Sequence, residues 1–446
     1  MTWHIICLAG PTDSYAPDLA PGDGLLYVPY DIPNHPDAVQ TSLPDVFATH
    51  GIDPTTAAHD LLKAAIGAYT GDIRIDRSRA YDGWTRDLAL HLPVHEFSRW
   101  TSRGAPRLTN LLSFLTGDHW QVLVRPVPAG YQPVRGQVQG VPVRVETDTV
   151  CLFSGGLDSY IGAVDALAAG GQVALVGHYA AGQGPTSSAQ RQTLAAMAMA
   201  YPIDKMPFLK CWVSPPKGPQ RATEMTTRGR SILFLALGIA VASGLASARL
   251  LVPENGFISL NVPLTPPRSG SLSTRTTHPH LIAQVRALLE DLGIEVAVEL
   301  PYRFSTKGEM IVACSNQEVL LRGLPITMSC SHPGVGRFIR GGSANQHCGY
   351  CLPCLVRRAG VSTWGADPTR YTWRDLSGYL SPSRRADLRA LRLALQRHSQ
   401  RPPVLADILV SGPLPGTSED LDAYLGVYRR GLRELQQFVD NFARES

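Results

Sequence analysis

The chain has 446 residues, of which 44% are hydrophobic and 17% are charged, and its formal net charge is +4. This length is enough for two or three globular domains, and so small a charge argues against nucleic acid or an anionic membrane surface as the main partner. The sequence has no apolar run long enough to span a bilayer and no basic amino-terminal signal, so we expect a cytoplasmic protein.

Residues 1–145 are expected to form an N-terminal α+β accessory domain. Apolar patterning predicts three strands and two helices there, at residues 3–8, 86–92 and 120–124 and at residues 54–69 and 107–115 respectively. None of these segments carries a reaction signature. A stretch rich in Gly, Pro and Gln at residues 126–142 predicts a linker.

From residue 149 onward, strands and helices alternate. Strands are predicted at residues 149–153, 173–176, 208–213, 249–252 and 294–298, with helices between them. Such alternation favours a doubly wound parallel sheet with helices on both faces, which we assign to residues 146–360. Residues 361–446 are expected to be a helical C-terminal region packed against this domain, with a partner-binding face as the alternative.

A glycine-containing hexapeptide follows the first of these strands and opens a helix. It consists of Ser154, Gly155, Gly156, Leu157, Asp158 and Ser159. The glycines let the backbone approach a ligand, and the helix start attracts anions. Asp158 is suited to hold Mg²⁺ between phosphates. The hexapeptide has neither the lysine of a Walker loop nor the spacing of a dinucleotide fingerprint, so we interpret it as a pyrophosphate site. The alternative is a plain turn.

Three cysteines, Cys348, Cys351 and Cys354, stand at two overlapping C-x-x-C spacings, and Cys330 precedes them. Four thiolates at such spacings predict a structural zinc ion with no open coordination position. An iron–sulfur cluster is the alternative, and His332 and His347 are possible substitute ligands. The other four cysteines are expected to be buried free thiols.

The hexapeptide resembles the SGGxDS signature of the PP-loop ATP pyrophosphatases, which cleave ATP to AMP and pyrophosphate. With the cysteine set it is similar to the QueC family, the 7-cyano-7-deazaguanine synthases. Arg230 at the head of an apolar helix, Lys307 in Thr-Lys-Gly-Glu, and the Ser-Cys pair at residue 330 match further family motifs. The resemblance covers residues 148–360. It implies a HUP-like fold, ATP, Mg²⁺ and a structural Zn²⁺.

The resemblance implies that Asp158, Arg230 and Lys307 act on ATP. The family's substrate segment is not evident here, and the base-recognition candidates in its place are Glu254, Asn255 and Asn261. Thr277 and His278 are candidates to contact the substrate or the incoming amine, with a helix-capping loop as the alternative. For Lys307 alone, a solvated surface lysine is the alternative.

The ordinary synthase lacks both the front domain and the helical tail, so the whole chain looks most like the QatC-type proteins of bacterial anti-phage systems. That likeness implies adenylation of 7-carboxy-7-deazaguanine and transfer to an amine, with the amino-terminal amine of a partner protein favoured. The alternative is synthesis of the nitrile (preQ0) from ammonia. Further alternatives are a PP-loop tRNA-modifying enzyme and a non-catalytic adaptor.

Overall fold

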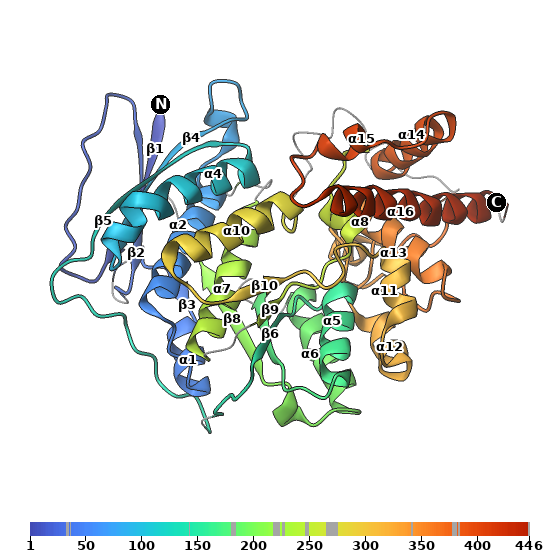
Figure 1. The fold of residues 1–446 in the computed structure, drawn as a ribbon, viewed down its shortest axis with the longest axis horizontal. Coiled ribbons are helices and arrows are strands. Elements are labelled where there is room, and N and C mark those ends of the chain that lie inside the picture. Colours follow the sequence, from blue (N-terminus) through green and yellow to red (C-terminus); the bar gives the residue numbers. More distant parts are fainter. Residues whose placement is uncertain are drawn as a thin grey trace.

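The computed structural model describes the chain except for residues 33–34, 36, 142, 180–183, 217–223, 225–227, 246–248, 265–274, 340–341, 377–380, 382–383 and 445–446. Two sheets organise the α/β fold. Figure 1 shows the first sheet and the helical C-terminal region at opposite ends of the molecule, with the second sheet between them.

The first sheet, here called the front sheet, has four strands in the order β2-β1-β4-β5, all parallel. They are β1 (Thr2–Ala9), β2 (Gly24–Tyr30), β4 (Asp87–Val94) and β5 (His119–Pro126). Helix α2 (Thr56–Arg74) lies between β2 and β4 in the chain, with the short α1 (Leu43–His50) before it. After β4 come α3 (Phe97–Arg99) and α4 (Ala105–Thr116), which lead to β5.

The expectation of an α+β unit at residues 1–145 was therefore wrong. Parallel neighbours need crossover connections, and the two predicted helices lie in the connections from β2 to β4 and from β4 to β5, whereas residues 10–23 join β1 to β2 without a helix. The strand that the sequence did not reveal is β2, which contains Pro29. Proline is tolerated at a sheet edge, where one side of the strand has no ladder to complete, and β2 is an edge strand.

The second sheet has six strands in the order β10-β9-β6-β7-β8-β3. Five are parallel: β6 (Thr149–Leu152), β7 (Ala174–Tyr179), β8 (Phe208–Ser214), β9 (Arg249–Leu251) and β10 (Ala297–Glu299). This confirms the predicted parallel sheet. The chain fills the sheet from β6 to β8 on one side and then crosses to β9 on the other, so the strand order reverses between β6 and β9.

Four helices connect the parallel strands of the second sheet: α5 (Leu157–Ala168), α6 (Pro185–Ala198), α7 (Arg230–Gly244) and α10 (Pro279–Leu292). At the sheet's far edge, β3 (Gln40–Thr41) pairs antiparallel with β8. A strand from residues 1–145 thus completes the second sheet. The domain boundary at residue 145 stays a prediction.

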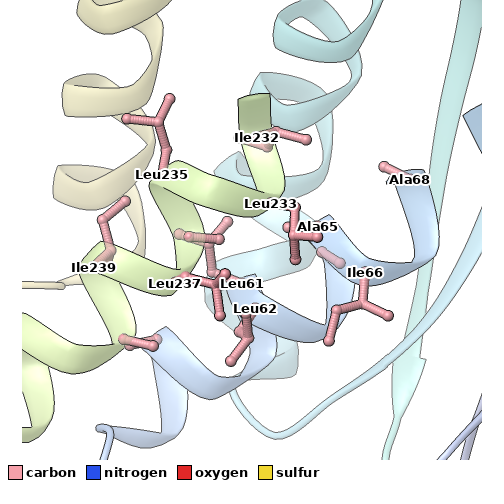
Figure 2. Packing of buried hydrophobic residues seen from close by; sticks show 14 of the residues in the cluster. Leu61, Leu62, Ala65, Ile66, Ala68, Ile232, Leu233, Leu235, Leu237 and Ile239 are labelled. Carbon is pink, nitrogen blue, oxygen red and sulfur yellow. The ribbon is translucent and has the colours of Figure 1, made fainter. Parts of the chain in front are cut away.

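Helices α2 and α7 join the two sheets into one hydrophobic core. Leu61 and Leu62 of α2 lie against Leu233 and Leu237 of α7 (Figure 2), and one buried cluster runs through both sheets. Helix α7 is apolar on almost every side because it lies between the second sheet and α2.

A charged contact fixes the start of α7. The carboxylate of Asp72, near the end of α2, accepts the backbone N–H groups of Arg228 and Gly229 at 2.5 and 2.6 Å. It also accepts a hydrogen bond from the buried Arg86 at 2.7 Å. Residues 1–145, here called the front unit, therefore position the first residue of α7, which is Arg230.

The C-terminal part of the structure is helical. It contains α11 (Lys307–Ala313), α12 (Gln317–Gly323), α13 (Leu352–Ser362), α14 (Ala386–Gln400), α15 (Leu405–Leu409) and α16 (Ser418–Arg444). The long α16 packs over α13 and over α8 (Gly256–Ser259) through a second apolar cluster. Within the described part of the chain, no helix has both the length and the apolar character needed to cross a bilayer.

Candidate functional site

The hexapeptide at residues 154–159, here called the glycine loop, joins the carboxyl end of β6 to α5. Gly155 has a φ of +80°, and a Cβ there would lie 2.9 Å from the backbone N of Gln190, so the turn requires glycine. The hydroxyls of Ser154 and Ser159 lie 3.1 Å apart. Among the described residues, the backbone N–H groups of Gly155, Asp158 and Ser159 have no hydrogen-bond partner. The loop thus offers free donors at a helix start, which suits an anion.

The glycine loop lies where ligands bind in open parallel sheets. Such sheets bind ligands outside the carboxyl ends of their strands, at the point where the strand order reverses. In the second sheet this point lies between β6 and β9. After β9, Asn255 donates from its backbone N and its Nδ2 to Asp158 Oδ2, at 3.1 and 2.7 Å. The ends of the two strands are therefore joined directly at the loop.

Lys307 completes this group. It is the first residue of α11, it is 5% exposed, and its Nζ forms an ion pair with Asp158 Oδ1. Thr306 and Glu309 form a capping box at this helix start, with Glu309 Oε2 accepting the Thr306 N–H at 2.8 Å. The side chain is thus buried at the loop rather than solvated.

Two distant helices hold Lys307 in place. On α16, the carboxylate of Glu434 accepts the hydroxyl of Thr306 and the backbone N–H of Gly308, the latter at 3.4 Å. On α13, a Cβ at Gly360 would lie 3.1 Å from the Cβ of Lys307, so the two helices meet almost backbone to backbone. The C-terminal region therefore contributes to the geometry of the loop.

The two carboxyl groups of the site have opposite protonation preferences. Burial alone would raise the pKa of Asp158, but the Lys307 ammonium and hydrogen bonds outweigh it and lower the pKa to about 2. Burial, followed by the charge of Asp158, raises the pKa of Glu254 well above its usual value. Asp158 is therefore held in its ionised form, whereas the surroundings of Glu254 favour its protonated form.

Arg230 lies on the same sheet edge but apart from this group. Its exposed guanidinium donates to the carbonyl oxygen of His178 at 3.2 Å, near the carboxyl end of β7. Because β7 is the neighbour of β6, the cation faces the crevice side of the sheet.

The other predicted substrate residues lie beyond α8. The Thr277 hydroxyl is 3.0 Å from that of Ser259, and the carbonyl of Asn261 accepts the hydroxyl of Ser411 at 2.8 Å. His278 caps α10 by accepting the N–H of His280 at 3.2 Å, and burial lowers its pKa to about 3. In the described residues, none of the three predicted substrate side chains hydrogen-bonds to Asp158, Glu254 or Lys307. The His278 contact is the helix cap that the sequence left open as an alternative.

The four predicted metal ligands come together. The sulfur atoms of Cys330, Cys348, Cys351 and Cys354 all lie within 4.8 Å of one another, and two of the pairs are 3.9 Å apart. A tetrahedral zinc ion with Zn–S bonds of about 2.3 Å requires sulfur separations of about 3.8 Å. Gly349 adopts a φ of +92° between the first two ligands of the C-x-x-C pair. The cluster can therefore hold a zinc ion.

Backbone N–H groups donate hydrogen bonds to a sulfur of this cluster. Cys330 Sγ accepts the N–H groups of His332 and Cys348 at 3.2 Å each. The two histidines proposed as substitute ligands are not needed, and Nε2 of the buried His347 accepts the N–H of Ser329 at 3.2 Å. In turn, Ser329 Oγ accepts the N–H of Leu157 at 3.2 Å, which ties the cysteine cluster to the glycine loop.

Sequence reasoning missed several residues that shape the site. Gln190 donates to the carbonyl of Phe153 at 3.1 Å and supports the loop from α6. Glu434 lies on an amphipathic helix whose sequence gave no sign of a contact 128 residues away. Ser329 was part of a matched Ser-Cys pair, but its neighbouring cysteine, not its hydroxyl, was the predicted functional group.

The fold and site define a class, namely an α/β protein with a glycine loop at the switch point of a parallel sheet and a cluster of four cysteines that could hold a metal ion. No protein-family model matches the chain, and no curated protein matches it. The particular activity therefore has to be argued from the site.

Proposed function

We propose that the chain is an ATP-dependent ligase of the QueC-like PP-loop kind. It adenylates the carboxylate of 7-carboxy-7-deazaguanine and passes the acyl group to an amine, with release of AMP and pyrophosphate. One observation carries the proposal most strongly: free N–H groups of the glycine loop adjoin the buried Asp158–Lys307 pair at the switch point. A carboxylate needs such activation because oxide is too poor a leaving group.

The phosphates of ATP are assigned to the glycine loop. The free N–H groups of Gly155, Asp158 and Ser159 would bind the departing pyrophosphate, where preorganised donors contribute most to catalysis. Mg²⁺, when bound, would neutralise phosphate charge, and Asp158 is its protein ligand. Lys307 adds a positive charge from the opposite side, and Arg230 adds another from the end of β7.

Glu254 is the candidate to recognise the base. A guanine-type edge presents N–H donors, which a carboxylate accepts and a protonated acid does not. Because burial favours the protonated form of Glu254, binding of the base through this group would require loss of that proton. Asn255 donates to Asp158 through both of its nitrogens, so its assigned role is to position Asp158.

The acceptor amine distinguishes the two favoured reactions. A protein amine would give a secondary amide, and the reaction would stop there. Ammonia would give a primary amide, which a second ATP could convert to the nitrile. We favour the protein amine, within a cytoplasmic anti-phage system, because the front unit and the C-terminal helices offer surfaces for docking a protein.

Intact-mass analysis tests this assignment. Proteins encoded beside this one are mixed with the chain, ATP and 7-carboxy-7-deazaguanine. The proposal expects one of them to gain the mass of the acyl group at its amino terminus, and a Lys307→Met chain to give no gain. Free nitrile with no modified protein would identify the ammonia-dependent synthase instead. No consumption of the deazaguanine by either route would contradict both.

A further inference from the structure

The segment that carries the first cysteine of the cluster lies directly against the glycine loop. The backbone N–H of Met328 donates to the carbonyl of Gly155 at 2.8 Å, and the hydroxyl of Ser329 accepts the N–H of Leu157 at 3.2 Å. The next residue, Cys330, is one of the four predicted metal ligands. Three consecutive residues therefore connect the glycine loop to the cysteine cluster.

A second ligand-bearing segment fixes Ser329 from the other side. The backbone N–H of Ser329 donates to Nε2 of His347 at 3.2 Å, and His347 directly precedes the ligand Cys348. His347 is 2% exposed, and its carbonyl accepts the N–H of Thr372 at 2.8 Å. The N–H of Cys348 in turn donates to Cys330 Sγ at 3.2 Å. The position of Ser329 is therefore set by residues adjacent to two of the ligands.

Helix α13 forms a further connection between the cluster and the site. Its N-cap is the ligand Cys351, the ligand Cys354 lies in its first turn, and the helix packs against α11 (Figure 1). Gly360 of α13 meets Lys307, which pairs with Asp158. Both parts of the proposed nucleotide site, namely the glycine loop and the ion pair, are thus in contact with segments that carry cysteine ligands.

A bound metal ion stabilises the arrangement of the four sulfurs. Zinc binds cysteine as the thiolate, and without an ion four thiolates within 4.8 Å of one another repel, whereas four thiols form only weak hydrogen bonds. Binding of zinc at such a site is therefore coupled to folding of the segments that supply the ligands. In this chain those segments include Ser329 and the start of α13.

The order of the glycine loop in turn affects how it binds phosphate. The free N–H groups of Gly155, Asp158 and Ser159 can act on one ligand together only while the loop keeps its shape. A loop that has lost its contacts to Met328 and Ser329 must first be ordered, and this lowers its apparent affinity. Nucleotide therefore favours the zinc-bound protein, and by linkage zinc binds more tightly to the nucleotide-bound protein by the same factor.

We propose that zinc at the cysteine cluster and ATP at the glycine loop bind cooperatively, and that Ser329 is the positioning residue that couples them. The inference rests on the proposed function, because it takes ATP as the ligand of the loop. It adds a role for the cysteine cluster beyond stability of the fold, since occupancy by zinc then controls the affinity for ATP.

Isothermal titration calorimetry measures the affinity of the full-length, zinc-loaded chain for α,β-methylene-ATP with Mg²⁺, an analogue that cannot be cleaved to AMP and pyrophosphate. Ser329→Ala is expected to weaken binding about fivefold, which corresponds to the loss of one hydrogen bond. Ser331→Ala is the matched control, because Ser331 flanks Cys330 on its other side, is exposed and has no hydrogen bond to a described residue. This control is expected to bind as the wild type does, and far-UV circular dichroism checks the fold of both variants.

The zinc affinity is the second readout, and it separates coupling from a merely structural role of Ser329. It is measured by equilibrium competition with a coloured chelator, with and without saturating analogue. In the wild type the analogue is expected to raise the zinc affinity about fivefold or more. In Ser329→Ala most of this increase is lost, whereas a merely structural defect would lower the zinc affinity equally with and without the analogue.

Two results would overturn the inference while leaving the proposed function in place. One is an equal affinity of Ser329→Ala and the wild type for the analogue, or an equal loss in Ser331→Ala. The other is a wild-type zinc affinity that the analogue does not change, and this comparison needs no variant, so it decides the matter if Ser329→Ala does not fold. An analogue that fails to bind the zinc-loaded wild type would instead contradict the proposed function, and the inference with it.

Discussion

The buried pair of Lys307 and Asp158 gives the sharpest test of how the site is built. Replacing Lys307 with Met keeps the length of the side chain and removes its charge. Asp158 then remains ionised in a place where it is only 6% exposed, with the two hydrogen bonds from Asn255 and the one with Glu254 as its remaining support. We expect the Lys307→Met protein to be strongly destabilised.

The magnitude follows from two estimates. A close pair of unit charges is worth about 4 kcal/mol at an effective dielectric constant of about 20. Removing one partner of a buried pair costs about 3–5 kcal/mol in measured cases. The double variant Asp158→Asn, Lys307→Met leaves no buried charge behind, so it should recover most of the loss and lie within about 2 kcal/mol of the wild type.

Urea denaturation followed by far-UV circular dichroism measures these differences in the free energy of unfolding. The four proteins of the double-mutant cycle are compared at equal zinc loading, in the same transition. If Lys307→Met lowers the free energy of unfolding by less than about 1 kcal/mol, the ion pair behaves as an exposed surface pair rather than a buried one. A double variant no more stable than Lys307→Met would refute the reasoning equally.

Three further predictions follow from the same contacts. The wild type should contain about one zinc ion per chain, and Cys351→Ser should lose the metal and unfold more easily, whereas Cys211→Ser, a buried thiol outside the cluster, should keep the metal. Because the pKa of folded Glu254 is raised, its contribution to stability is complete below about 4.5 and is lost as pH rises through the folded pKa. Glu254→Gln should therefore gain stability over the wild type as the pH rises above about 4.5 in urea denaturation, and a difference that stays constant with rising pH would contradict the assignment. Asp72→Asn removes the charge that fixes the start of α7, and it should lower kcat for AMP formation through Arg230 more than it changes the KM for ATP; equal activity would mean that the front unit does not position Arg230.

The sequence alone predicted those features that depend on residues close together in the chain. The glycine loop, the cysteine spacings and the alternation after residue 149 each place several residues within one or two elements, and the structure has the corresponding turn, cluster and parallel sheet. The pairing of Lys307 with Asp158 spans 149 residues. Local pattern reveals no such contact, so only the fold brings the two side chains together.

The fold class of the front unit was predicted wrongly from the local sequence pattern. Its strands and helices were found, but β2 was hidden by a proline and by the Gly- and Pro-rich segment before it. Without β2, the remaining strands did not reveal a four-stranded parallel sheet with a switch point. A contact that no sequence motif indicates joins α2 to the residue after β4, because His95 Nδ1 lies 2.8 Å from Asp60 Oδ1.

The central claim is that the glycine loop binds the phosphates of ATP so that a carboxylate can be activated. Its most direct test is product analysis after incubation of the purified chain with ATP, Mg²⁺, 7-carboxy-7-deazaguanine and the acceptor amine, supplied as ammonium or as the partner protein. The account predicts equal amounts of AMP and pyrophosphate from the wild type and neither from Asp158→Ala. Formation of ADP and phosphate alone, or equal turnover by the variant, would contradict it.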